Sequence, residues 1–110
     1  MTPRRNHTKE ERATRRDAPL EKVIVGRVMD EATRLGFLAM KMHGSAFSLR
    51  GLPDVLAIKD GKACWMECKR PGEEPTRVQM ARMRELVKAG CSVAVVTSAG
   101  EARDFLERVT

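Results

Sequence analysis

The chain has 110 residues, of which 42% are hydrophobic, so its length allows one folded domain with one core. The 21 Lys and Arg residues outnumber the 15 Asp and Glu residues, which gives a formal net charge of +6. This balance favours a polyanionic partner, nucleic acid above all. No apolar run approaches the roughly 18 residues that a membrane-spanning helix needs.

Three cysteines, Cys64, Cys68 and Cys91, indicate the redox environment of the chain. An odd cysteine count, with a charged N-terminus that lacks an apolar signal segment, is typical of reduced thiols in a cytoplasmic protein. No second pair of Cys or His ligands would complete a tetrahedral zinc site. We therefore expect buried free thiols.

Residues 1–18 differ in composition from the rest of the chain, because they are rich in Arg and Lys and show no apolar periodicity. They are interpreted as a basic flexible N-terminal arm, which is either a solvated tail or a segment that contacts phosphate groups. Residues 19–110 are expected to form a single folded domain.

From Pro19 onward the chain alternates between helical and strand patterns. Pro19 suits the first turn of a helix, and Gly36 suits its end. Asp60-Gly61 is a strong signal for a two-residue hairpin turn. The predicted elements are, in order, a helix over 19–35, strands over 37–43, 53–59 and 63–69, a helix over 77–89, a buried strand over 92–97 and a helix over 99–108. This order predicts an α/β fold with a central mixed four-stranded sheet flanked by helices.

The Asp60-Gly61 turn sets the register of the two strands that it connects. Counting outward from the turn places Asp54 directly opposite Glu67. Opposed residues point to the same face with Cβ atoms roughly 4.5–5.5 Å apart, and Lys69 shares this face by the two-residue period. The sequence thus predicts two carboxylates and an amine at one place on the sheet.

Like charges directly opposite each other destabilise a sheet unless a divalent cation lies between them. Such a cation beside a phosphodiester can activate water, and a lysine can neutralise charge that develops in the transition state. The alternative is a salt-bridged surface face, but Leu56 and Trp65 on the same face argue against plain exposure. The opposite face is predicted to be core and carries Val55, Ala57, Cys64, Met66 and Cys68.

The run Gly51-Leu52-Pro53-Asp54, then Glu67-Cys68-Lys69, then Gln79 on the following helix, resembles the VRR-NUC (virus-type replication-repair nuclease) domain family of the PD-(D/E)xK superfamily. The likeness covers about residues 20–107 and includes the Asp-Gly hairpin and the order of elements. It implies a restriction-endonuclease-like α-β-β-β-α-β-α core and a deoxyribonuclease that uses Mg²⁺ or Mn²⁺. By position, Asp54, Glu67 and the backbone carbonyl of Cys68 would bind the metal, and Lys69 and Gln79 would be catalytic.

Glu21 matches a glutamate in the first helix of many superfamily members, which makes it a further candidate for catalysis and for metal binding. Its charge would also suit the first turn of a helix for purely structural reasons. Gln79 has a structural alternative too, because Thr76 and Gln79 fit a capping box.

Basic and polar residues near the predicted site are candidates for DNA binding. They are Lys41, His43, Ser45, Arg70 and Arg77, with Arg82 and Arg84 continuing the basic set along the second helix. His43 also fits an ordinary loop histidine, and any solvated helix can carry such arginines.

The resemblance implies a structure-selective DNA endonuclease, similar to Holliday-junction resolvases, that acts as a homodimer on branched DNA. Its role would lie in DNA repair or recombination, in the cytoplasm of a bacterial or phage-infected cell, without a membrane partner. Two alternatives stay open: a non-catalytic nucleic-acid-binding module on a nuclease fold, and a nuclease subunit of a larger replication or repair assembly. The intact set of Asp54, Glu67 and Lys69 argues against the first alternative.

Overall fold

The structure, a computed structural model, describes residues 19–42 and 49–110. The elements are α2 (Glu21–Arg34), β1 (Leu38–Lys41), β2 (Val55–Lys59), β3 (Lys62–Cys68), α3 (Arg77–Lys88), β4 (Ser92–Val96) and α4 (Ala99–Val109). The predicted basic arm over residues 1–18 lies outside the described residues, as do His43 and Ser45. Among the described residues no helix combines the length and the apolar character needed to cross a membrane.

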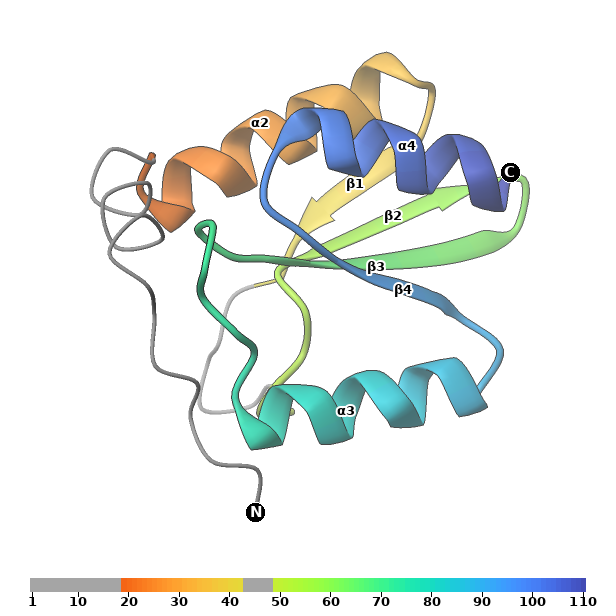
Figure 1. Cartoon of the computed structure of the whole chain (residues 1–110). Helices are drawn as coiled ribbons and strands as arrows, with labels where there is room; N and C mark the ends of the chain where they lie inside the picture. Colours follow the sequence, from red (N-terminus) through yellow and green to blue (C-terminus); the bar gives the residue numbers. More distant parts are fainter. Residues whose placement is uncertain (1–18, 43–48) are drawn as a thin grey trace.

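The strands form one four-stranded sheet in the order β1-β2-β3-β4, in which only β3 and β4 are parallel. The helix α3 connects these two strands across one face, and α2 and α4 cover the other face (Figure 1). The mixed four-stranded sheet flanked by helices, and the order of its elements, are therefore confirmed.

The hairpin between β2 and β3 has the register that the Asp60-Gly61 turn predicts. Asp60 and Gly61 have φ values of 51° and 77°, as a two-residue hairpin turn of this type requires. The pairing runs outward from the turn to Val55 opposite Met66. The next positions along the two strands are those of Asp54 and Glu67.

The core lies between the sheet and the pair α2 and α4. All five residues predicted to face it, Val55, Ala57, Cys64, Met66 and Cys68, are 0% exposed. Helix α2 contributes Ile24 and Val28, and helix α4 contributes Phe105 and Leu106. The cysteines are free, and Cys64 and Cys68 are buried as predicted, whereas Cys91 is only partly buried.

Three sequence predictions differ from the structure. Pro19 lies before α2 rather than in its first turn, because the helical hydrogen bonds begin with Leu20, whose carbonyl accepts from the Ile24 N–H. Strand β2 begins at Val55 rather than at residue 53, since Pro53 has no N–H for a sheet ladder. Strand β4 is an edge strand rather than a buried one, and its Val95 side chain is 42% exposed.

Candidate active site

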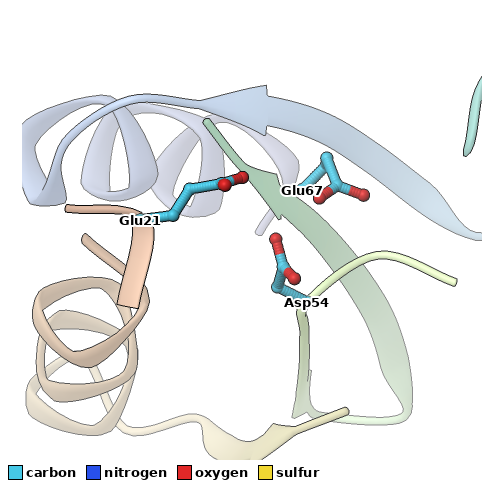
Figure 2. A group of neighbouring side chains, drawn as sticks. All are labelled: Glu21, Asp54 and Glu67. Atoms are coloured by element: carbon cyan, nitrogen blue, oxygen red, sulfur yellow. The ribbon is translucent and has the colours of Figure 1, made fainter. Parts of the chain in front are cut away.

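Three carboxylates from separate parts of the fold lie together at one end of the sheet (Figure 2). Glu21 is the first residue of α2, Asp54 directly precedes β2, and Glu67 is the second-last residue of β3. One oxygen of each carboxylate lies within 4.8 Å of the others. The structure therefore brings Glu21 into the group that Asp54 and Glu67 were predicted to form.

Asp54 is held by its backbone and by its side chain. Its carbonyl oxygen accepts a hydrogen bond from the Met42 N–H at 2.8 Å. Its Oδ2 accepts a hydrogen bond from the Cys68 N–H, also at 2.8 Å. The side chain thus bonds to the strand β3 beyond the last β2–β3 backbone pair, and this orients the carboxylate toward Glu67.

Glu67 is a buried carboxyl group, with only 1% of the residue exposed. Among the described residues its Oε2 has no hydrogen-bond partner. Burial is the main reason that the pKa of Glu67 rises to about 9, and the hydrogen bonding and charge of Asp54 add to this rise. Without a cation the Glu67 carboxyl group therefore holds a proton at neutral pH.

Lys69 extends from the end of β3 toward the same carboxylates. The residue is 8% exposed, and its Nζ lies 3.6 Å from Oε1 of Glu21. The low exposure of Glu67 and Lys69 is incompatible with the alternative of a solvated, salt-bridged surface face.

These residues fit a hard divalent cation. Mg²⁺ and Mn²⁺ prefer oxygen donors, and carboxylates are the usual protein ligands. An unpartnered buried carboxylate oxygen is costly by itself, whereas a cation among the three carboxylates would satisfy it. The Cys68 side chain instead belongs to the hydrophobic core, where burial raises the pKa of its thiol to about 12, and its sulfur is not among the three grouped ligand atoms. A contribution from the Cys68 carbonyl stays a prediction.

Gln79 forms the capping box that was its structural alternative. Its N–H donates to Oγ1 of Thr76 at 3.2 Å, and its Oε1 accepts from the Thr76 N–H at 2.8 Å. This arrangement starts α3 and orients the Gln79 side chain. A catalytic role for Gln79 stays a prediction.

The other basic candidates within the described residues differ in their exposure and in their partners. Lys41 and Arg77 are exposed, and Arg70 is partly buried beside Glu73. Arg82 donates to the carbonyl oxygen of Arg50 and pairs with Glu85, and its contact with DNA stays a prediction. A contact between a side chain and a backbone carbonyl far away in sequence leaves no pattern that could be recognised in advance.

Comparison with known proteins identifies a nuclease family. The family model described as "Archaeal holliday junction resolvase (hjc)" matches residues 14–94. The protein named "Putative nuclease p44", of Acyrthosiphon pisum secondary endosymbiont phage 1, is 34% identical over 84 residues, which cover 76% of this chain and 84% of that protein.

Two solved structures share the fold. One is named "VRR_NUC domain", with a TM-score of 0.69 and 24% identity over 82% of this chain and 97% of the other. The second is named "VRR_NUC domain protein", with a TM-score of 0.69 and 18% identity over 83% of this chain and 88% of the other. The chain is therefore a nuclease of the archaeal Holliday junction resolvase (Hjc) family, with the VRR-NUC fold of the PD-(D/E)xK superfamily.

Proposed function

We propose that this nuclease hydrolyses phosphodiester bonds within DNA, using Mg²⁺ or Mn²⁺ held by Glu21, Asp54 and Glu67. The observation that carries the proposal is the buried, unpartnered Oε2 of Glu67 within a set of three carboxylates. Burying a carboxylate and crowding it with others destabilises a fold. A site that keeps this arrangement is best explained by a cation that the carboxylates bind.

Each residue of the site has a distinct proposed role. A bound cation would polarise the phosphoryl oxygen and activate water. Asp54 is pre-oriented by the Cys68 N–H, and Glu67 would have to lose its proton to the solvent to act as a ligand. Lys69 lies beside the carboxylates, where its amine can neutralise charge on the phosphate in the transition state. Glu21 holds that amine next to the site and supplies a further oxygen.

We further propose that the Cys68 carbonyl completes the set of metal ligands and that Gln79 contacts the substrate or the attacking water. Lys41, Arg70 and Arg77 would contact DNA phosphates, as would His43, Ser45 and the basic arm over residues 1–18. The net charge of +6 supports a polyanionic substrate. Residues 19–110 would form the nuclease domain, acting in the cytoplasm of a bacterial or phage-infected cell.

The substrate class that we propose is branched DNA, cut by a homodimer whose two sites address two strands. The family match to Holliday junction resolvases supports this proposal. An apolar surface also supports it, because Val87 and Val95 are 57% and 42% exposed. They belong to a groove of about 320 Å³ lined by Met83, Arg84, Val87, Val93, Ala94 and Val95.

The test is cleavage of a synthetic four-way junction beside a linear duplex of the same sequence, each with Mg²⁺, with Mn²⁺ and with chelator. We expect metal-dependent cutting of the junction and little cutting of the duplex. Equal cutting of both would overturn the substrate selectivity and leave the nuclease chemistry intact. Binding without cutting in either metal would instead favour a non-catalytic module, or a subunit that needs its assembly.

The oligomeric state is tested separately by light scattering during size-exclusion chromatography. A homodimer gives twice the 12.3 kDa mass of one chain. A single-chain mass at the concentrations of the cleavage assay would contradict the proposed dimer.

A further inference from the structure

The position of Asp54 depends on a segment without regular secondary structure. Asp54 lies between the described residues 49–53 and the first residue of β2. Figure 1 shows that this segment passes beside the N-terminal end of α3 and then leads to the start of β2. Whatever holds the segment against α3 therefore also determines where the Asp54 carboxylate lies.

Gly51 brings this segment into direct contact with α3. Its φ is +80°, which a residue with a side chain rarely adopts. A Cβ at this position would lie 2.7 Å from the Val78 carbonyl oxygen and 2.8 Å from Val78 Cγ1. Both are closer than atoms can pack, so only glycine allows the backbone to approach the helix this closely.

Arg82 adds a polar contact on the same side of α3, one helical turn after Val78. Its Nε–H donates to the Arg50 carbonyl oxygen at 3.0 Å. Its Nη1 donates to Oε2 of Glu85 at 2.7 Å, which fixes the direction of the guanidinium group. Arg82 thus ties the residue next to Gly51 to the helix.

We propose that Gly51 and Arg82 are positioning residues that hold Asp54 in place for metal binding. This inference rests on the proposed metal-dependent function. Metal ligands must be held within roughly 0.5 Å of a productive geometry, and residues that orient the ligands typically change metal affinity by about 10–100-fold when lost. Gly51 and Arg82 contact the segment and α3 rather than the three carboxylates of the site. Their effect on metal binding would therefore pass through the segment that leads to Asp54.

The first experiment measures Mn²⁺ affinity by calorimetry for the full chain and its variants. We expect Arg82→Ala and Gly51→Ala to weaken Mn²⁺ binding by about 10-fold or more. Arg103→Ala is the control for Arg82, since Arg103 also pairs with a glutamate on its own helix. Gly61→Ala is the control for Gly51, because Gly61 has a φ of +77° but nothing within 4 Å of its Cβ position.

The second experiment does not depend on metal. It measures hydrogen exchange of the Cys68 amide by NMR, because this N–H donates to Asp54. We expect about 10-fold faster exchange at Cys68 in Arg82→Ala than in Arg103→Ala, with the Met66 amide unchanged, as for a local opening. Arg82→Ala serves this purpose even if Gly51→Ala fails to fold.

The outcomes separate the inference from the proposed function. If the wild-type chain binds no Mn²⁺, the proposed function fails, whereas the Cys68 amide still shows whether Arg82 positions Asp54. If the wild-type chain binds Mn²⁺ but Arg82→Ala matches Arg103→Ala in both affinity and Cys68 exchange, the positioning role is overturned. Unchanged exchange at Cys68 alone also overturns it.

Discussion

The substitution Glu67→Gln tests how much the buried Glu67 carboxyl group lowers the free energy of unfolding. Glutamine has nearly the same shape as glutamate and cannot ionise. In the absence of metal, we expect the variant to be more stable than the wild-type chain at neutral and alkaline pH. The reason is that burial makes the ionised form of Glu67 unfavourable in the folded chain.

The sign and size of the effect follow from the pKa of Glu67. This pKa is about 9 in the folded chain, against 4.5 for an ordinary glutamate. The folded chain therefore keeps a proton that the unfolded chain releases, and wild-type stability falls as the pH rises from about 4.5 toward about 9. Each pH unit within this window costs up to about 1.4 kcal/mol. At pH 7 the expected gain in stability of Glu67→Gln over wild type is roughly 1–3 kcal/mol. It is less than the full cost of ionisation because solvent screens the charge and because the new amide must itself be buried.

The assay is thermal unfolding in chelator at about pH 5 and about pH 8 for wild type, Glu67→Gln and Glu107→Gln. Glu107 is an exposed glutamate on α4 and serves as the control. A gain of 1–3 kcal/mol corresponds to a Tm increase of roughly 5–15 °C for a domain of this size, and the gain should nearly vanish at the lower pH. Equal stability of Glu67→Gln and wild type at both pH values would show that the ionised Glu67 carboxylate does not destabilise the folded chain.

Three further substitutions separate chemistry from stability. Lys69→Met should keep Mn²⁺ binding within a few-fold by calorimetry and lower the single-turnover cleavage rate by about 10²–10³-fold; a wild-type rate would remove Lys69 from the mechanism. Gln79→Ala should lower the free energy of unfolding by about 1 kcal/mol in urea titrations, since the bond from the Thr76 N–H to Gln79 Oε1 is lost while the Gln79 N–H can still donate to Thr76, and no change would mean that this side-chain bond contributes nothing to stability. Met66→Ala should cost roughly 2–5 kcal/mol in the same titrations because Met66 is 0% exposed, and a cost below about 1 kcal/mol would contradict its place in the core.

The parts of the fold that were predicted correctly depend on local signals. A two-residue turn at Asp60-Gly61 leaves one register for the hairpin, and the two-residue period then assigns every side chain of β2 and β3 to a face. That register is why Asp54 and Glu67 could be placed together from the sequence. The burial of Met66 and Cys68 follows from the same count.

The parts that were not predicted depend on contacts between distant residues. The edge position of β4 is a matter of which strands pair, and an apolar run such as Ser92–Val96 fits an edge or a centre equally well. None of the residues of α3 is buried, and the helical spacing of its apolar residues cannot decide whether they face the core or a partner. Whether Glu21 reaches the site depends on where α2 crosses the sheet. The docking of Gly51 on Val78 has no local signature either.

The most direct test of the central claim is DNA cleavage by Asp54→Asn beside the wild-type chain in saturating Mn²⁺. Asparagine keeps an oxygen for the Cys68 N–H and removes the charge that would bind the cation. We expect metal-dependent cleavage by the wild-type chain and a rate lower by at least about 10²-fold in the variant. Cleavage by Asp54→Asn at the wild-type rate would contradict the assignment of this carboxylate cluster as the active site.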